Sequence, residues 1–288
     1  MLVVNNACSD DTSVVVASFA ERLPLRETYE AEPGVAMARN RAVLESTGTH
    51  LAFIDDDILV EKTWLTALAE LVTRYPESAA FGGPVRAYFS EAPNPALAAA
   101  FPYLRRGFCS LDYNRQEGPL PDGLLPAGAN MVFRKASLNG LKFDPRLGVK
   151  RDLCAGHEDV ALLSRLRADG GSIMWSPQLS VGHYVDPSRT TAAYLARHAR
   201  DRASSRVLAF GVPAGRQLFG VPLHILLGLG VSRLAYESLR LTPFRRLRLR
   251  WMARAYRFDG KLRGCRESAI ERRHTVGRVT GPPEAPGA

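Results

Sequence analysis

Cysteine is scarce in this sequence, which has only four among its 288 residues. They are Cys8, Cys109, Cys154 and Cys265, and no pair has the spacing of a zinc site or a CxxC motif. Such sparse usage excludes a small scaffold held together by disulfides and is typical of a reducing compartment. An apolar fraction of 46% predicts instead an ordinary globular protein with a hydrophobic core.

Hydrophobic runs long enough to cross a membrane are missing as well. The main candidate, 218–231, is interrupted by Pro222 and His224 and falls short of the ~20 residues that a spanning helix needs. This run could form a buried, a re-entrant or an interfacial segment. No secretory signal is expected in the first residues, because polar side chains appear from Asn5 onward. The expected location is therefore cytoplasmic.

Acidic residues are few in the last third of the chain. From residue 192 to the end there are 19 Lys and Arg but only 6 Asp and Glu, a net charge of +13, whereas the preceding residues carry −4. The run from Arg245 to Trp251 combines arginine, leucine and tryptophan, which is typical of a helix at a lipid headgroup surface. We expect 192–274 to be a basic helical region that associates with an anionic membrane, and 275–288 to be a disordered tail. Solvated arginine-rich helix faces are the alternative, and no recognised module predicts a nucleic-acid partner.

The first part of the chain alternates strand and helix patterns. Strands are predicted at 2–4 and 51–54, and helices at 13–20, 35–46 and 61–75. Strands separated by helices of this length indicate βαβ units and a parallel sheet, in which ligands collect at the carboxyl ends of the strands. Two polar segments, 5–12 and 55–57, follow such strand ends, so we expect both to face one ligand site.

Three carboxylates, those of Asp55, Asp56 and Asp57, come directly after the apolar strand 51–54. Adjacent carboxylates repel one another, and a bound cation relieves that repulsion. Carboxylate oxygens suit Mg²⁺ or Mn²⁺, which proteins often hold with one or two carboxylates plus substrate phosphates. A polar loop that caps the helix starting near Trp64 would explain the same residues, so the triplet alone leaves both interpretations open.

A second acidic pair, Glu158 and Asp159, opens the helix predicted over 157–169. A carboxylate in this position can act as a general base toward a hydroxyl group. The helix dipole also favours acidic residues in a first helical turn, so the pair taken alone could be purely structural.

Three segments that carry these residues follow one another in order: VVNNACSDDT at 3–12, GVAMARN and AFIDDD within 34–57, and GHEDVAL at 156–162. Their order and spacing resemble the family 2 glycosyltransferases of GT-A fold, over about residues 1–190. The resemblance implies a Rossmann-like α/β GT-A domain at 1–191, followed by the basic helical extension. It also implies inverting, metal-dependent transfer of a sugar from a nucleotide-diphosphate donor to a saccharide or lipid-linked acceptor.

The resemblance gives roles to the acidic residues. Asp55 and Asp57 match the outer positions of the DxD motif, with Asp57 contacting a divalent cation, Mg²⁺ or Mn²⁺, and Asp55 facing the ribose or sharing the cation. Asp159 matches the catalytic base, and Glu158 would orient the acceptor or the base. His183 stands where many GT-A enzymes have a histidine near the diphosphate or metal, although a core histidine would explain it equally well.

The resemblance also implies a donor-binding set. Arg39 matches a position near the donor's base and diphosphate, which suits its fork of N–H donors, although an ordinary surface arginine is the alternative. Asn5 stands where relatives often have an aspartate that reads uracil. Asp10 and Asp56 lie in the same donor-binding segments.

On the acceptor side the resemblance covers Gly128, Ala129 and Asn130. Small residues there would let a substrate approach the backbone. Trp64 and Trp175, in contrast, are expected in the core rather than as platforms on which a sugar stacks.

One unit of the family is absent from this sequence. Relatives begin with a further strand and helix ahead of the segment matched by 2–12, and this unit supplies part of the nucleotide floor. We expect the true start to lie upstream. The alternative is a catalytically inactive partner protein that has lost the unit. The location expected for the active enzyme is peripheral, at the inner face of the cell membrane.

Overall fold

The computed structural model describes the chain over residues 1–92, 95, 105–148 and 156–279. The chain forms two compact units, Met1–His198 and Ala199–Ala288. Helix α7 (Ala192–Phe210) begins in the first unit and continues into the second. Each unit has its own cluster of buried apolar side chains.

The first unit alternates short strands with helices, as the sequence pattern predicts. Its strands are β1 (Leu2–Asn5), β2 (Arg26–Tyr29), β3 (His50–Ile54), β4 (Ile58–Val60), β5 (Ala80–Gly82), β6 (Val85–Tyr88), β7 (Gly118–Pro119), β8 (Asn130–Arg134), β9 (Ile173–Trp175) and β10 (Val181–Tyr184). Its helices are α1 (Thr12–Ser18), α2 (Val35–Glu45), α3 (Trp64–Arg74), α5 (Lys135–Leu138) and α6 (Glu158–Ala168). Short 3₁₀ segments are η1 (Arg105–Phe108), η2 (Pro177–Leu179) and η3 (Pro187–Thr190).

The strands of this unit form three separate sheets. Five strands pair in the order β3-β8-β5-β9-β7, three pair in the order β4-β10-β6, and β1 pairs in parallel with β2 alone. In the largest sheet β3, β5 and β9 run in one direction, whereas β8 and β7 run in the opposite direction. The prediction of a parallel sheet is therefore wrong for β8 and β7. In the described part of the chain no short βαβ crossover leads into either strand, so nothing local there constrains its direction.

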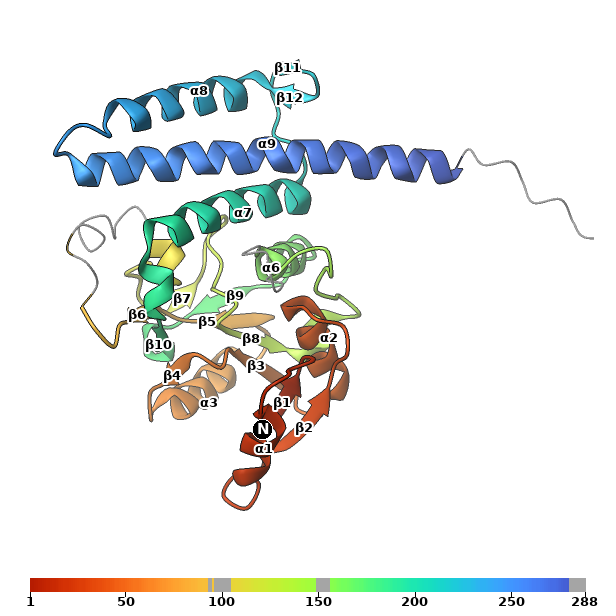
Figure 1. Ribbon diagram of the computed structural model, residues 1–288. Coiled ribbons are helices and arrows are strands. Elements are labelled where there is room, and N and C mark those ends of the chain that lie inside the picture. Colours follow the sequence, from red (N-terminus) through yellow and green to blue (C-terminus); the bar gives the residue numbers. More distant parts are fainter. Residues whose placement is uncertain (93–94, 96–104, 149–155, 280–288) are drawn as a thin grey trace, which may run out of the picture. The chain divides into compact units, whose positions relative to one another are not determined.

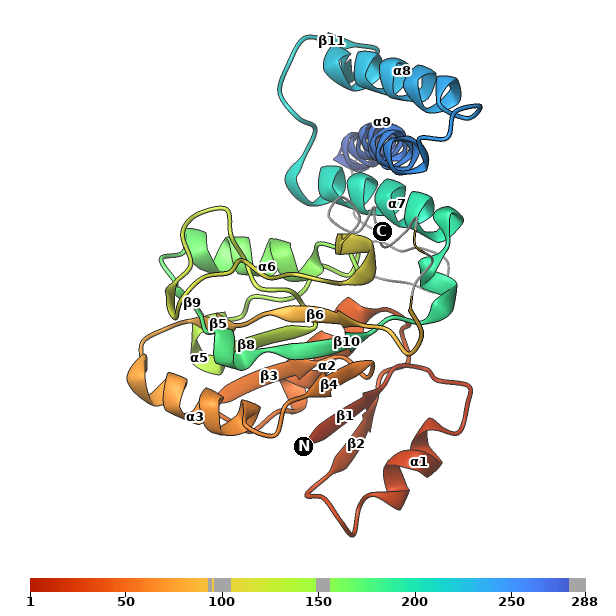
Figure 2. The same ribbon diagram turned by 90° about the vertical axis from the view of Figure 1, so that its left-hand side faces the viewer.

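Strand β8 separates two apolar layers of the core. Met131 and Phe133 pack in the cluster that includes the buried leucines of α6. Val132, which points to the other side, packs with Trp64 of α3. Figures 1 and 2 show α6 and α3 on opposite faces of this sheet. Trp64 and Trp175 are both buried, so their predicted place in the core is confirmed.

The apolar stretch around 81–85 is divided between two strands, β5 and β6, which belong to different sheets. At the break, Gly83 lies so close to the backbone of Leu179 that a Cβ atom would be 2.4 Å from its carbonyl oxygen. Pro84 cannot donate a ladder hydrogen bond. The chain therefore leaves the five-stranded sheet here and enters the three-stranded sheet, which carries His183 in β10.

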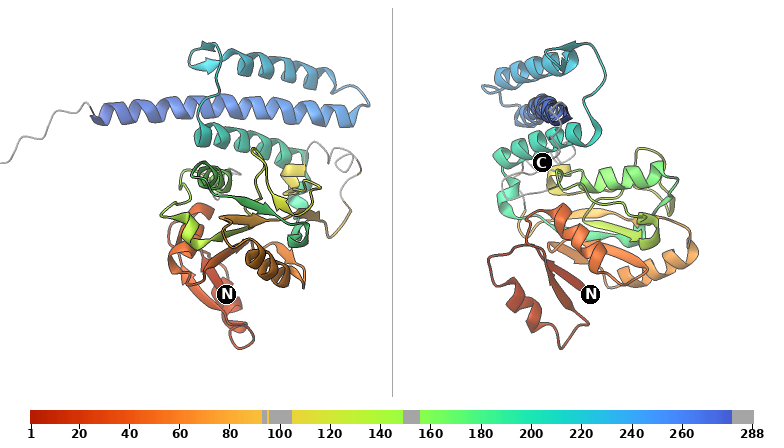
Figure 3. Two further views of the ribbon diagram at one scale, coloured as in Figure 1. Left: turned by 180° about the vertical axis from the view of Figure 1, so that it is seen from behind. Right: turned by 90° about the vertical axis from the view of Figure 1, so that its right-hand side faces the viewer.

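The second unit is helical apart from one hairpin. Besides the end of α7, its elements are β11 (Gln217–Leu218), β12 (Val221–Pro222), α8 (Leu223–Ser238) and α9 (Arg245–Val279). Figures 1 and 3 show α8 running alongside α9. Its apolar cluster is formed by the buried side chains of Val207, Val221, Ile225 and Cys265.

Two expectations for this part differ from the structure. The apolar run 218–231 is not one segment, because it is divided at Pro222 between the hairpin and the first half of α8. Helix α9 continues to Val279, past residue 275, where the disordered tail is predicted to begin. The proline pair at 282–283 lies further on, and 280–288 fall outside the described residues. Over the part of the chain that the structure describes, no helix has the length and apolar character of a membrane-crossing segment.

Candidate active site

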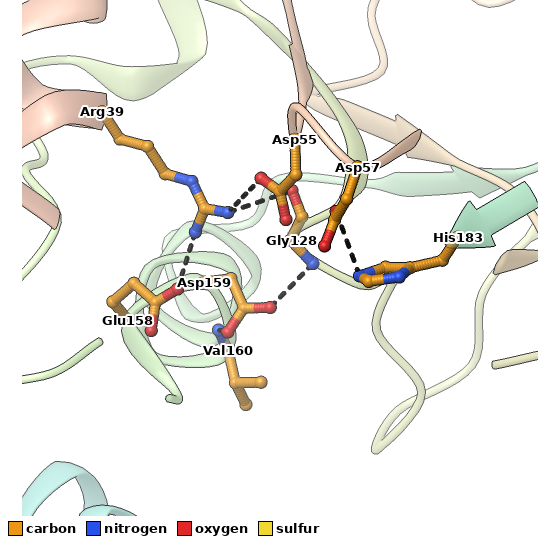
Figure 4. A network of polar contacts seen from close by, with 8 residues as sticks. All are labelled: Arg39, Asp55, Asp57, Gly128, Glu158, Asp159, Val160 and His183. Atoms are coloured by element: carbon orange, nitrogen blue, oxygen red, sulfur yellow. Dashed lines mark hydrogen bonds and ion pairs between the residues drawn. The ribbon is translucent and has the colours of Figure 1, made fainter. Parts of the chain in front are cut away.

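The register of the largest sheet brings two loops together. Ile54, the last residue of β3, pairs with Asn130, the first residue of β8. Because these strands are antiparallel, the chain that leaves β3 at Asp55 lies beside the chain that enters β8 through Gly128. Figure 4 shows both segments next to the start of α6, which carries Asp159. Segments far apart in the sequence therefore meet at one site.

Arg39 joins these segments through its guanidinium group. It lies on the buried side of α2. Its Nη1 donates to Glu158 Oε1 at 2.6 Å, and its Nη2 donates to Asp55 Oδ1 at 3.2 Å and to the Gly128 carbonyl at 3.3 Å. Burial lowers the pKa of Arg39, but the charges of Asp55, Glu158 and Asp159 outweigh it and raise the pKa above its ordinary value. The predicted donor-binding arginine thus lies among carboxylates of the protein itself.

Asp159 stands in the first turn of α6 with its carboxylate held at both oxygens. Oδ2 accepts a hydrogen bond from the Gly128 N–H at 2.8 Å, and Oδ1 accepts one from the Val160 N–H at 2.8 Å. Each carboxylate oxygen can accept a further bond, so the group can still receive a proton. The positive end of the helix dipole also lies at this position. The arrangement suits a general base that is held in one orientation.

Gly128 has to be a glycine because two side chains approach its backbone. A Cβ atom here would lie 2.8 Å from Asp159 Oδ2 and 3.0 Å from Arg39 Nη2. The sequence predicts a small residue that admits the substrate. The structure gives a different reason for a glycine, because the carboxylate of Asp159 and the guanidinium of Arg39 occupy the space that a side chain would need.

The other two residues of the predicted acceptor segment point into the fold. Ala129 is buried, and Asn130 is completely inaccessible to solvent. The Asn130 side-chain amide donates to the carbonyl oxygens of Leu179 at 2.6 Å and of Pro84 at 3.3 Å. Its side chain therefore ties the start of β8 to η2 and to the connection between β5 and β6 rather than lining the site.

Asp57 lies at the other end of the acidic triplet, beside β10. Its Oδ1 is 3.3 Å from His183 Nε2, and its Oδ2 accepts a hydrogen bond from Arg189 Nη1 at 3.2 Å. Burial raises the pKa of Asp57, the charges of His183 and Arg189 lower it, and those of Asp55 and Asp56 raise it again, with a net shift upward. The triplet is thus a concentrated negative charge that already attracts cationic side chains.

His183 is buried in β10, where its Nδ1 contacts the Tyr184 carbonyl oxygen at 2.8 Å. Burial lowers the pKa of His183, but a hydrogen bond with the Cys109 side chain and the charge of Asp57 outweigh it and raise the pKa to about 9. At neutral pH the imidazole is therefore protonated and forms an ion pair with Asp57.

Sequence reasoning missed two neighbours of this pair, Arg189 and Cys109. Arg189 lies in η3, which is preceded by its N-cap Asp186 and begins at Pro187, shortly after the end of β10. An Asp–Pro dipeptide predicts a turn. A turn at this place directs the chain back toward the end of β10, so the dipeptide is the sequence signal that could have identified Arg189. Cys109 lies in a segment without periodicity, and no pattern points to it.

The turn after β1 is organised by its own contacts. The Asn5 side-chain amide donates to Ser13 Oγ at 2.9 Å and to Glu27 Oε1 at 3.0 Å. Asp10 accepts two hydrogen bonds from Thr12, which lower its pKa. Among the described residues these contacts stay within the turn and its flanking elements. The structure thus shows how these two predicted donor-binding residues shape the turn itself.

The donor set at the end of β3 fits a divalent cation only in part. Asp55 and Asp57 flank the exposed Asp56, and the three carboxylates repel one another. Within the described ranges, no group of three or more His, Cys, Asp or Glu side chains is arranged to hold a metal ion by itself. The side chains of Asp57 and His183, 3.3 Å apart, could supply only part of a cation's ligands, and substrate phosphates would have to supply the rest.

Residues 1–139 match the family model described as Glycosyl transferase family 2. This match covers 139 of the chain's 288 residues and makes that part of the chain similar to glycosyltransferase family 2. The resemblance seen in the ordered motifs is therefore confirmed, and the protein is a transferase.

The chain is similar to a named polysaccharide-biosynthesis protein and to solved structures. Succinoglycan biosynthesis protein ExoM of Rhizobium meliloti (strain 1021) is 29% identical over 231 residues, covering 77% of this chain and 69% of the relative. Mannosyltransferase PcManGT from Pyrobaculum calidifontis, solved in complex with GDP-Man and Mn²⁺, is 17% identical with a TM-score of 0.54, covering 91% of this chain and 76% of that one. S. aureus TarS 1–349, solved in complex with UDP, is 15% identical with a TM-score of 0.50, covering 94% and 81%. These likenesses confirm the predicted GT-A fold class.

Proposed function

We propose that this glycosyltransferase moves a sugar from a nucleotide-diphosphate donor to a hydroxyl group of a saccharide or lipid-linked acceptor, with inversion at the anomeric carbon. The observation that supports this most is the Arg39 bridge, which holds Asp55 of the donor-side loop and Glu158 of the base helix on one guanidinium. Two similar folds were solved with GDP-Man or UDP, which supports a nucleotide donor.

Asp159 is the base in the proposed reaction. Its carboxylate takes the proton of the acceptor hydroxyl while that oxygen bonds to the anomeric carbon. The bond from this carbon to the β-phosphate oxygen breaks at the same time, and the electron pair leaves with the nucleoside diphosphate. Attack from the side opposite the leaving group inverts the configuration. The Gly128 and Val160 amides keep the carboxylate in the orientation that the attack requires.

The acidic triplet forms the donor end of the proposed site. Asp57, Asp55 and His183 would hold a divalent cation, Mg²⁺ or Mn²⁺, and the Mn²⁺ in the PcManGT structure supports this choice. When bound, the cation would offset the negative charge on the leaving diphosphate. We place Asn5, Asp10 and Asp56 along the donor nucleotide, in keeping with the family's motifs.

The membrane is the proposed place of action. We propose 1–191 as the catalytic domain, 192–274 as a basic region that associates with the inner face of the cell membrane, and 275–288 as a tail. The net charge of +13 from residue 192 onward supports attraction to anionic lipid. The name of ExoM, a succinoglycan biosynthesis protein, supports an acceptor that is part of a cell-envelope polysaccharide.

The alternative, an inactive partner protein, is not favoured. The described residues keep a carboxylate at the donor end and another at the start of α6, and Arg39 connects both ends. A protein freed from catalysis would have no use for this costly arrangement of buried charge.

Nucleotide release from a panel of UDP-sugars and GDP-sugars, with Mn²⁺ and candidate saccharide acceptors, tests the proposal. Asp159→Asn keeps the shape of the side chain but removes its basicity, so transfer should fall by a factor of about 10² or more while donor affinity stays unchanged. Asp169→Asn is the matched control, because it makes the same substitution at the exposed end of the same helix. Normal transfer by Asp159→Asn, or an equal loss in the control, would remove Asp159 from the role.

A further inference from the structure

An apolar stripe runs along one side of α8. Leu227, Val231 and Leu234 recur at intervals of four and three residues, so they share one side of the helix. They are 59–71% exposed. Ile225 and Ser232, on the other side, are buried where α8 packs along α9 (Figure 3). The helix thus has two sides with apolar residues, and the described chain covers only one of them.

Apolar side chains continue beyond both ends of the helix. Phe219, at the tip of the hairpin that precedes α8, is 95% exposed. Leu241 and Phe244, in the connection between α8 and α9, are also exposed. Figures 1 and 2 show the hairpin and this connection at opposite ends of α8. We name as the α8 apolar face the side chains of Phe219, Leu227, Val231, Leu234, Leu241 and Phe244.

Phe219 occupies a position that normally excludes a bulky residue. Strands β11 and β12 are joined by the two-residue loop Phe219–Gly220, and both residues have positive φ angles, 51° and 75°. Such hairpin loops prefer asparagine and glycine, because a side chain with a Cβ is strained there. Packing within the chain does not offset the strain, since the ring is in solvent. Strain at an exposed aromatic residue points to a partner outside the chain.

Arginines lie near the α8 apolar face in the sequence, and one of them, Arg233, pairs with Asp259 of α9. Between Arg216 and Arg250 the sequence has seven arginines and a single acidic residue, Glu237, which pairs with a neighbouring arginine. Arg216 precedes the hairpin tip, and Arg245 opens α9 next to the exposed connection. An apolar surface with arginines at its margins matches an anionic bilayer, because acyl chains accept the apolar groups and lipid phosphates attract the guanidinium groups.

We infer that the α8 apolar face enters the headgroup boundary of an anionic lipid bilayer, with α8 lying in the plane of the membrane. This inference rests on the proposed membrane association and names the residues that carry it. With 16 residues α8 is ~24 Å long, shorter than the ~30 Å hydrocarbon core, so an orientation along the surface suits it and a spanning one does not.

Cosedimentation of the full chain with vesicles tests this inference. We expect binding to vesicles of mixed phosphatidylcholine and phosphatidylglycerol, and much weaker binding to phosphatidylcholine alone. The variant Leu227→Gln/Val231→Gln/Leu234→Gln should weaken binding to the mixed vesicles by about tenfold or more, because it removes apolar area that the membrane would bury. The positions are exposed, so the fold should tolerate the changes.

A matched control is available in the first unit. Val14, Leu44 and Leu65 are one valine and two leucines, as in the stripe, and they are 71–72% exposed. The triple substitution of these residues by glutamine removes a similar apolar area away from the α8 apolar face. It should leave vesicle binding unchanged.

Phe219→Asn separates a membrane role from a structural one. Asparagine tolerates the left-handed conformation better than phenylalanine, so the melting temperature should stay the same or rise. Vesicle binding should nevertheless fall severalfold, because the exposed ring is lost. A variant that binds vesicles as well as the parent would contradict the inference.

Other outcomes would also overturn it. The inference fails if the parent chain ignores anionic vesicles, or if the stripe variant binds them as well as the parent does. A self-association measured by sedimentation velocity that disappears in the stripe variant, with vesicle binding intact, would assign the face to a second copy of the chain.

Nucleotide release in solution should be unchanged in the stripe variant. Vesicle binding without any transferase activity would thus refute the proposed function and leave this inference standing.

Discussion

At the scale of single residues, the buried pair of Arg39 and Glu158 governs the geometry of the site. Both side chains are 7% exposed, and Arg39 contacts Glu158 at 2.6 Å. The same guanidinium group also donates a hydrogen bond to Asp55. Charges withdrawn from water to this extent are stable only while each keeps its partner. The pair holds the start of α6 against the loop that follows β3, and in the proposed function this would position the base.

Replacing Arg39 by methionine should destabilise the fold by about 3–5 kcal/mol, because Glu158 and Asp55 are left without their shared partner. Arg39→Lys keeps the charge but cannot bridge both carboxylates, so it should fold and lose kcat more than donor affinity. Chemical denaturation and transfer kinetics measure the two effects. Arg165→Lys is the control, because Arg165 forms only an exposed ion pair on α6. A lysine variant with the parent's kcat would contradict the positioning role.

His183 gives a prediction about pH. Its pKa of about 9 lies above the ordinary 6.5, so Mn²⁺ binding through the imidazole must displace a proton at neutral pH. The affinity for Mn²⁺ should therefore rise with pH, by up to about tenfold per unit, and level off above pH 9. Calorimetry with Mn²⁺ between pH 6.5 and the plateau measures this slope. His183→Gln should bind more weakly, with little slope; an equal slope in the variant would exclude His183 as a ligand.

The sequence identifies only part of this residue-level arrangement. Asp55, Asp57 and Asp159 could be predicted because carboxylates at a strand end and at a helix start follow recognisable patterns. Arg189 and Cys109 could not, because their approach to Asp57 and His183 depends on the path of two irregular segments. The partners of Arg39 were also missed, since an ion pair across 119 positions leaves no local trace.

At the scale of elements, local patterns predict most helices and strands but not their partners. Strand β8 is apolar enough to be recognised as a strand, yet its antiparallel direction depends on pairing with β3 and β5, which are distant in the sequence. The break between β5 and β6 depends on the close approach of Gly83 to Leu179. Hydrophobic periodicity predicts one element at a time. It therefore cannot predict strand pairing or close contacts between residues that are distant in the sequence.

Helix α8 offers a paired test of packing. A Cβ atom at Gly228 would lie 2.3 Å from the ring of Phe258, whereas one at Gly230 would have open space. Gly228→Ala should therefore destabilise the second unit by roughly 1–3 kcal/mol through overpacking. Gly230→Ala should stabilise it by up to about 1 kcal/mol, because alanine is the better helix former. Thermal unfolding of the full chain followed by circular dichroism measures both. Equal effects of the two substitutions would show that α8 does not pack on Phe258.

At the scale of the whole molecule, charge is divided between the parts of the sequence. The residues before 192 carry −4 and those from 192 onward carry +13. A lipid surface would therefore attract the second part far more strongly than the first, and the attraction would fall as salt rises. Catalysis and membrane association are proposed for different parts of one chain, so each can be removed without the other.

This division predicts how the enzyme treats a lipid-linked acceptor. Transfer to such an acceptor should be faster in anionic vesicles than in neutral detergent micelles, because binding at the surface raises the local concentration of enzyme. The stripe variant of α8 should lose this advantage and keep its rate in micelles. Transfer assays with one acceptor in both environments measure the ratio. A ratio unchanged by the variant would mean that the second unit does not deliver the enzyme to its acceptor.

The small sheet of β1 and β2 has a consequence for local stability. These strands pair only with each other among the described residues, and a two-stranded sheet is only marginally stable by itself. Backbone amides of β1 should open and exchange with solvent hydrogen far more often than those of β8, which is paired on both sides. The turn that begins at Asn5, which the proposed function places along the donor nucleotide, should thus have little protection. An arriving nucleotide would meet a loosely held segment there, and part of its binding energy would be used to order it.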